Sequence, residues 1–424
     1  MDTSTNPEPR RRSFLKRAGG AAALALLSPP AAFAATPREL VAFDVAMTDF
    51  LKENRAPGAS LAISKDGRLV YARGFGVADR ESGDPVTPAS LFRIASVTKP
   101  FTAVAVLRLA GQGRLSLDAG AWEFLGLAEP SDRRWKRVTI LQLLQHTGGW
   151  DRDKSFDPMF RSPQVSSALS TAPPAGVAEI IRYMLGKPLD FEPGSRHAYS
   201  NFGYCLLGRV IEHASGRPYG AYVAEELLRP LGVRRMRLGR TLREHRAPGE
   251  VAYYDELNRL EPAVTGPIGT RVPLPYGRWS LEAMDAHGGW IASAADLVRF
   301  ACAFDDAERS PLLPPEGIAR MLAAPEGAAG READGSPQRV HYGCGWQVRP
   351  NATVDQSVAW HYGSLAGSST LLARAHHRVN FAVLFNTRAN PDGRLLAPAV
   401  VSLLHRTAKQ VQRWPEADLF PALL

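Results

Sequence analysis

Ser96 and Lys99 are the first residues of this sequence that could carry out covalent chemistry together. A serine hydroxyl is a weak nucleophile at neutral pH unless a neighbouring base removes its proton. A lysine three residues later on a helix lies beside the serine, and burial lowers the pKa of its amine so that it can serve as that base. Pro100 favours a helix start here, where free N–H groups stabilise a developing negative charge. The pattern S-x-x-K therefore predicts acyl transfer at Ser96.

Two further groups of polar residues could complete such a site. Tyr199 and Asn201 stand at an expected loop-to-helix junction, where the phenol can share a proton with a serine and the amide can hold a substrate carbonyl or amide. His361 ends an expected strand and could give a polar or cationic contact to a substrate carboxylate, while Gly363 lets another backbone approach closely. The structural alternatives are Asn201 as a helix N-cap and His361 as a hydrogen-bonded strand residue.

The order of the three groups along the chain carries more weight than any one of them. The serine-to-lysine spacing alone also occurs at Ser13 and Lys16, inside a segment where it cannot be catalytic. Three chemically compatible motifs in the order S-x-x-K, Y-x-N and H-x-G are much less expected by chance. They predict one active site, provided that the fold brings the three segments together.

Helix and strand patterns place these motifs on different elements. Apolar spacing predicts an amphipathic helix over 40–51, and Asp66-Gly67 between two apolar runs predicts a hairpin. Stretches that are apolar on every side indicate buried helices at 101–110 and 201–214. Strands are expected again at 345–348, 358–361, 369–373 and 380–386.

Strands at both ends of the chain and helices between them predict an α/β (α+β) fold. We expect one discontinuous sheet domain, made of residues 37–92 and 285–424, that ends in a helix over 395–409. A mainly helical domain of residues 93–284 is expected as an insertion into it.

The first 34 residues have the composition of an export signal. They carry +3 of the net charge of +9, and Arg11-Arg12-Ser13-Phe14-Leu15-Lys16 resembles the twin-arginine signal. The apolar stretch 21–27 is too short to span a bilayer, and Ala32-Phe33-Ala34 has the pattern of a cleavage site. We expect a periplasmic or secreted protein without a membrane span after cleavage; an ordinary secretory signal is the alternative.

Composition and motifs argue against several other classes of function. The net charge of +9 raises the question of a nucleic-acid partner, but the basic runs at 133–137 and 234–237 are short and scattered, so none is expected. No phosphate-binding loop, dinucleotide motif or zinc-ligand spacing is present, so no cofactor or metal is expected. Cys205, Cys302 and Cys344 are too few for a disulfide framework, and their pairing stays open, as does the oligomeric state.

Four segments carry motifs of a known family. They are Leu91–Pro100, Leu141–Gly149, Phe191–Gly194 followed by Tyr199–Asn201, and Gly288–Trp290 through Asp296–Leu297. The chain resembles the serine β-lactamase and penicillin-binding-protein superfamily, and most of all the branch with class C β-lactamases, D-alanyl-D-alanine carboxypeptidases, D-aminopeptidases and related esterases. The resemblance covers nearly all of the expected mature chain. It implies an antiparallel sheet flanked by the N- and C-terminal helices, with the helical domain inserted.

The resemblance also implies a role for each motif. Ser96 attacks a carbonyl and forms an acyl-enzyme, while Lys99 and Tyr199 move the protons. Asn201 positions the substrate, and the backbone N–H groups of Ser96 and Ser364 form the oxyanion hole. Water then releases the acyl group.

The sequence departs from class C β-lactamases at the third motif. Those enzymes usually carry Lys-Thr-Gly, whereas this chain has His361, Tyr362 and Gly363, as in some peptidase-like and esterase-like relatives. An exported hydrolase of ester or D-amino-acid peptide bonds, with a small-molecule or short-peptide substrate, is therefore favoured. A class C-type β-lactamase and a non-catalytic penicillin- or peptide-binding protein are the alternatives. The roles of His287 and of two long irregular stretches, 151–175 and 240–285, stay open.

Overall fold

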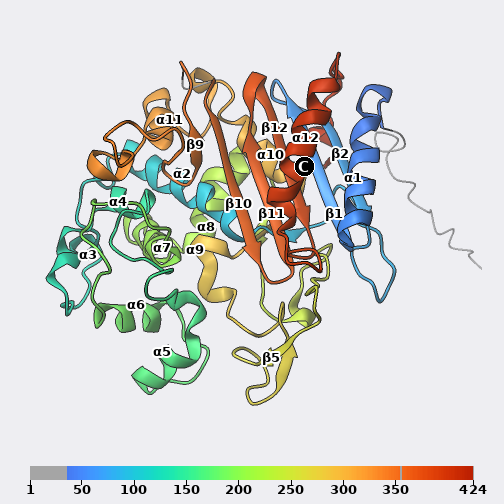
Figure 1. Cartoon of the computed structure of the whole chain (residues 1–424). Coiled ribbons are helices and arrows are strands. Elements are labelled where there is room, and N and C mark those ends of the chain that lie inside the picture. The colour runs from blue at the N-terminus through green and yellow to red at the C-terminus, as the bar shows by residue number, and fades with distance from the viewer. Residues whose placement is uncertain (1–35, 354–355, 424) are drawn as a thin grey trace, which may run out of the picture. The chain divides into compact units, whose positions relative to one another are not determined.

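A seven-stranded antiparallel sheet organises the fold of this protein, described here by a computed structural model (Figure 1). The structure describes residues 36–353 and 356–423. The strand order is β2-β1-β12-β11-β10-β9-β8, so strands from the two ends of the chain meet at the β1–β12 pair. The strands are β1 (Gly58–Lys65), β2 (Arg68–Gly76), β8 (His341–Tyr342), β9 (Gln347–Arg349), β10 (Val358–Leu365), β11 (Ser368–Arg374) and β12 (Val379–Phe385).

The hairpin between β1 and β2 forms where the sequence predicts it. Asp66 and Gly67 both have positive φ, at 51° and 76°, which is the backbone of a two-residue turn whose twist matches the flanking strands. β1 is buried over nearly its whole length because it lies between β2 and β12.

Helices cover both faces of the sheet. α1 (Val41–Asn54) and α12 (Leu396–Gln410) pack on one face, against a cluster that includes Ile63 and Phe381. α10 (Ala294–Cys302) packs on the other face, against β1, β2 and β12 (Figure 1). Alternation of side chains along each strand supplies both cores, since neighbouring residues point to opposite faces.

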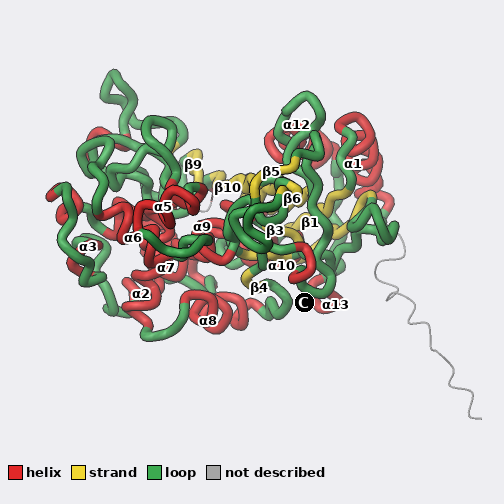
Figure 2. Tube along the Cα trace, turned by 90° about the horizontal axis from the view of Figure 1, so that it is seen from below, coloured by secondary structure: helices red, strands yellow, loops and turns green. Residues whose placement is uncertain are grey.

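Most of the remaining helices gather on one side of the sheet, as the view from below shows (Figure 2). α2 (Thr98–Gly111) and α7 (Asn201–Ser215) pack against each other and are buried along most of their length, as their apolar sequences predict. The other helices are α3 (Ala121–Phe124), α4 (Ile140–Leu144), α5 (Ser162–Leu169), α6 (Val177–Leu185), α8 (Tyr219–Val223), α9 (Asp285–Gly288), α11 (Pro315–Leu322) and α13 (Phe420–Leu423). Two small sheets are also present. One has the strand order β3 (Phe92–Arg93), β7 (Trp290–Ala292), β4 (Arg237–Leu238), and the other pairs β5 (Leu260–Pro262) with β6 (Arg271–Pro273).

The predicted fold class is confirmed, but one local prediction is wrong. The stretch 151–175 is not a loop throughout, because α5 forms within it and buries Val165. The long stretch 240–285 is irregular apart from the short β5–β6 pair and two single helical turns. Residues 36–424 form one compact unit, and the domain boundaries at 92/93 and 284/285 stay a prediction.

The predicted export signal at residues 1–34 lies outside the described residues. Within the described ranges, no helix has the length and apolar character needed to cross a bilayer.

Candidate active site

Ser96 lies in a tight turn at the start of α2. It belongs to the 3-10 helix Ala95–Val97, which leads directly into Thr98 and the rest of α2. Ala95 has a φ of 47°, in the left-handed region that residues with a Cβ rarely adopt. This turn packs directly against β10, and the contact depends on a residue without a side chain: a Cβ added to Gly363 would collide with the carbonyl oxygen of Ile94 and press on Ala95. The close approach expected at Gly363 thus positions the candidate nucleophile.

Lys99 is completely buried and touches three polar groups. Its Nζ lies 3.2 Å from Ser96 Oγ, 2.8 Å from Asn201 Oδ1 and 2.9 Å from the carbonyl oxygen of His287. The two carbonyl-type oxygens can only accept hydrogen bonds. A neutral amine has two N–H groups for these two oxygens and one lone pair for the Ser96 hydroxyl, so the surroundings fit a base that can remove the serine proton.

The electrostatics of the site favour this neutral form. Burial lowers the pKa of Lys99 well below its usual range, and the charge of Arg152 lowers it further. The carboxylate of Asp157 opposes this effect. Asp157 itself is buried, which raises the pKa of its carboxyl group.

Tyr199 supplies a second proton-carrying group beside the nucleophile. Its hydroxyl forms a hydrogen bond with the side chain of Ser96, while burial raises the pKa of the phenol, so that it keeps its proton at neutral pH. Its ring lies 4.8 Å from Lys99 Nζ and 4.6 Å from the Arg152 guanidinium. The His146 ring packs on it from the side, with ring centroids 4.3 Å apart.

Asn201 acts on Lys99 in this structure. Its Oδ1 accepts a hydrogen bond from Lys99, and its Nδ2 donates to Asp157 Oδ2 at 2.6 Å. Both ends of the amide are therefore occupied, and Asn201 is buried outside the main cleft. The cap expected as its alternative role falls to the residue before it, since Ser200 Oγ accepts from the Gly203 N–H.

His361 faces the cleft as a neutral, fully hydrogen-bonded ring. Nδ1 lies 2.7 Å from the Tyr362 carbonyl oxygen, which can only accept, so Nδ1 carries the proton. Nε2 then accepts from the Tyr342 hydroxyl at 2.9 Å. Burial lowers the pKa of His361 to about 3. The cationic contact to a substrate carboxylate expected from the sequence is therefore not supported, and the ring is better suited to position its neighbours.

Ser364 lies where β10 has a free edge. β9 pairs with β10 only from Val358 to Trp360, so the following residues have no strand partner on that side. The Ser364 hydroxyl accepts a hydrogen bond from Arg388 Nε at 3.0 Å. This free edge borders the same cavity as Ser96, as an oxyanion hole formed by the two N–H groups would require.

A cleft of about 790 Å³ connects these residues. Ser96, Tyr199 and His361 lie along it, and the two long irregular stretches form its walls. The first stretch contributes Arg152, Asp153, Asp157 and Phe160, and the second contributes Leu274, Arg278 and Trp279. The stretches whose role the sequence left open thus border the site where a substrate would bind.

Several residues of the site were not identified from the sequence. The sequence around Asp157 indicates only a turn. Asp157 precedes a proline, and its carboxylate accepts a hydrogen bond from the Met159 N–H two residues later. Tyr342 lies in the short strand β8 and meets His361 only through the fold. His287, whose role the sequence left open, contributes its carbonyl oxygen, whereas its ring does not line the cleft.

Other chemistries find less support in the described ranges. Residues 36–353 and 356–423 contain no group of three or more ligating side chains that could hold a metal ion. Cys205, Cys302 and Cys344 are free thiols.

Known proteins resemble this chain over most of its length. The family model described as Beta-lactamase matches residues 43–405. Esterase EstB of Burkholderia gladioli is 31% identical over 394 residues, which cover 88% of this chain and 96% of that protein. The octameric penicillin-binding protein homologue from Pyrococcus abyssi superposes with a TM-score of 0.63, at 26% identity, over 86% of this chain and 77% of that one. The D-amino acid amidase from Ochrobactrum anthropi SV3 shares the fold, with a TM-score of 0.67 at 19% identity over 89% and 99% of the chains.

Proposed function

Because the chain belongs to the β-lactamase family of serine hydrolases, we propose that it hydrolyses carboxylic esters through an acyl-enzyme at Ser96. The observation that carries the proposal is the environment of Lys99, whose two acceptor oxygens and one hydroxyl neighbour match a neutral amine. The similarity to an esterase over nearly the full length of both chains supports the ester as substrate.

The proposed reaction uses groups already in contact. Ser96 Oγ attacks the ester carbonyl carbon while its proton moves to Lys99 Nζ, and the N–H groups of Ser96 and Ser364 stabilise the oxyanion. Tyr199, which keeps its proton at neutral pH, gives that proton to the leaving alcohol oxygen as the C–O bond breaks, and the proton held on Lys99 replaces it. A water molecule then adds to the acyl-enzyme by the same proton transfers and releases the acid.

Asn201, Asp157 and His361 hold this arrangement in place. Asp157 fixes the amide of Asn201, which in turn directs its oxygen at Lys99. His361 aligns the β10 edge through the hydrogen bond of its ring to the Tyr362 carbonyl oxygen. Gly363 aligns it through the close contact with the Ala95 turn.

An amide of a D-amino acid is the second candidate substrate. Asp153 and Asp157 line the cleft together with Ser96, and a carboxylate at that position could bind the ammonium group of such a substrate. Arg152 lies in the same wall and opposes this binding, which is why the ester is preferred.

Three substrates and two variants test the proposal. The protein lacking residues 1–34, its Ser96→Ala variant and a Ser195→Ala control are incubated with a nitrophenyl butyrate ester, a D-alanine nitroanilide and a chromogenic cephalosporin. Ser195 is exposed and lies outside the cleft, so its variant keeps full activity. We expect turnover of the ester that Ser96→Ala abolishes. Equal turnover by both variants contradicts the role of Ser96, and stoichiometric labelling by the cephalosporin without release favours a binding protein.

We also propose that the protein is exported through the twin-arginine route before it acts. The support is the Arg11-Arg12 motif with the apolar stretch and cleavage pattern that follow it. Full-length protein with both arginines changed to lysine is expected to stay in the cytoplasm, whereas the unchanged chain reaches the periplasm or medium. If the double variant reaches the periplasm or medium as the unchanged chain does, the twin-arginine route is contradicted and an ordinary secretory signal explains export.

A further inference from the structure

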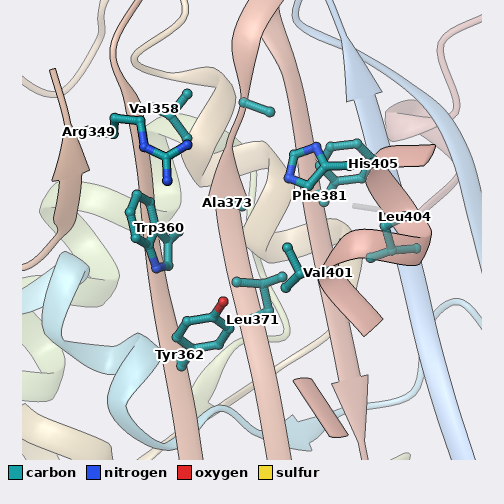
Figure 3. A pocket seen from close by; sticks show the side chains of 11 residues that line it. Arg349, Val358, Trp360, Tyr362, Leu371, Ala373, Phe381, Val401, Leu404 and His405 are labelled. Carbon is teal, nitrogen blue, oxygen red and sulfur yellow. The ribbon is translucent and has the colours of Figure 1, made fainter. Parts of the chain in front are cut away.

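A second cavity lies on the opposite face of β10 from the Ala95 turn (Figure 3). We call it the outer groove and define it by Trp360 and Tyr362 on β10, Leu371 on β11, Phe381 on β12, Leu404 on α12 and Arg349 at the end of β9. It has a volume of about 240 Å³. The groove lies beside α12, which packs against β11 and β12, and the half-buried Trp360 and Tyr362 of β10 form part of its floor.

The groove is apolar along its floor and has unmatched hydrogen-bond donors. Trp360 and Tyr362 are half-buried; Tyr362 lies next to Leu371, and the Arg349 side chain lies near Val358 and Trp360 (Figure 3). The Arg349 guanidinium, the Trp360 indole N–H and the Tyr362 phenol O–H have no hydrogen-bond or salt-bridge partner among the described residues. An occupant with an apolar body and an acceptor group would satisfy both parts of the surface.

Arg349 and His405, which line the groove, are both basic residues. His405 lines its wall, and burial lowers the pKa of that ring. The charged groups that act on His405 in addition are Lys409, His376 and Arg349, all of them basic. An anionic acceptor such as a carboxylate is therefore favoured over a neutral one.

The size of the groove limits the body of the occupant. A volume of about 240 Å³ corresponds to about eight water molecules at roughly 30 Å³ each. A chain or ring of about eight heavy atoms matches this space.

We propose that the outer groove is a second binding site, for a carboxylate with an aliphatic or aromatic body of medium size. The body lies on Trp360, Leu371 and Leu404, and the carboxylate pairs with Arg349. Tyr362 borders both the groove and the catalytic cleft, so the bound molecule lies directly behind the strand that carries Gly363 and Ser364. The site goes beyond the proposed function and does not depend on it.

Octanoate serves as the probe, measured by calorimetry and by tryptophan fluorescence with the protein lacking residues 1–34. Octanol tests the need for the charge, and butyrate tests the need for the apolar body. We expect saturable binding of octanoate that is much weaker for both controls. The Arg349→Ala variant should weaken it about 10-fold or more, as expected for a lost charged hydrogen bond. The Arg406→Ala variant should not, because Arg406 is exposed on α12 and does not line the groove.

Further arms separate the groove from the catalytic cleft and from other occupants. The Ser96→Ala variant and protein blocked at Ser96 by a fluorophosphonate should bind octanoate unchanged, and the Trp360→Phe variant should lose the fluorescence signal while melting at a similar temperature. Loss of binding on blocking Ser96 would assign the ligand to the cleft and overturn the proposal. A dimer that excludes octanoate, or binding to phosphatidylglycerol vesicles without binding of free octanoate, would overturn it as well.

Discussion

The two faces of β10 differ in how their polar groups are satisfied. On the inner face, His361 has both ring nitrogens in hydrogen bonds, and Gly363 is pressed against the turn before Ser96. On the outer face, Trp360 and Tyr362 border an apolar groove, and the indole N–H and the phenol O–H have no partner among the described residues. One strand can serve both surfaces because neighbouring side chains point to opposite sides. The comparison suggests that the inner face is built for one fixed geometry, whereas the outer face is open to a ligand.

The largest expected effect follows from removing the base on the inner face. Lys99→Met keeps the apolar stem but has no group to take the serine proton, so kcat for the nitrophenyl ester should fall at least about 10³-fold. Lys52→Met is the matched control, because Lys52 is exposed on α1 and lies outside the main cleft. Stopped-flow measurement of acyl-enzyme formation shows whether acylation is the step lost. Near-normal acylation in Lys99→Met would show that another group is the base.

The next prediction breaks the close contact between β10 and the Ser96 turn. Gly363→Ala adds a Cβ that collides with the Ile94 carbonyl oxygen, so the strand or the turn must move. We expect the free energy of unfolding to fall by about 1–3 kcal/mol, which is typical of overpacking. We also expect kcat/KM to fall about 10²-fold, because a shift of about 1 Å in the position of Ser96 disturbs the geometry of the reaction.

Gly111→Ala is the control for this change. Gly111 ends α2 and has open space around its Cβ position, so that variant should keep both stability and activity. Chemical denaturation gives the stability and steady-state kinetics give the activity. A fully active Gly363→Ala enzyme would mean that the contact does not position Ser96.

The charge of Asp157 offers a way to shift the pH profile of the inner face. Activity should rise with pH as Lys99 loses its proton, with a midpoint well below the usual range for lysine. The Asp157 carboxylate raises the pKa of Lys99, so Asp157→Asn removes that effect and lowers the pKa further. The acid limb of kcat/KM against pH should therefore move to lower pH. Asp153→Asn, in the same cleft wall but not among the groups acting on Lys99, should leave the limb in place.

Tyr342→Phe tests whether the His361 ring needs its second hydrogen bond. The variant leaves Nε2 without its donor, and a lost neutral hydrogen bond costs about 1 kcal/mol, so kcat should fall roughly fivefold with KM nearly unchanged. NMR of the imidazole nitrogens should show a changed Nε2 signal, while Nδ1 stays protonated. An unchanged Nε2 signal would contradict the bond.

The smallest expected effect connects the two faces. Tyr362 borders both the outer groove and the cleft, so saturating octanoate should change kcat/KM for a short ester by about twofold in the wild type. The Arg349→Ala variant should show no such change at the same concentration. An equal change in kcat/KM for the two proteins would mean that octanoate does not act through the outer groove.

The sequence allowed prediction of the elements and motifs whose signals are local. Ser96 and Lys99 share one helical turn, and the Asp66-Gly67 hairpin depends on two adjacent residues, so short-range patterns suffice. The structure brings the three predicted motifs to one cleft or its immediate surroundings.

What the sequence could not reveal depends on distant contacts. Asp157 reaches Lys99 only because the stretch 151–175 folds back over Asn201, and Tyr342 meets His361 only because β8 follows β9 in the sheet. The charge state of His361 depends on burial, which residue type alone does not give. α5 was missed because its Ser- and Pro-rich sequence has the composition of a loop.

The pairing of β1 with β12 has a consequence for how the protein is made. Lys65 lies opposite Val379 in this pair, so β1 leaves the ribosome long before its partner has been synthesised. One edge of a buried strand stays unpaired until residues 379–385 have been synthesised, and such edges favour aggregation. Ser96 likewise has no β10 opposite it until the same late stage. Nascent chains are therefore expected to need protection from aggregation and to acquire hydrolase activity only after β10, β11 and β12 have been synthesised.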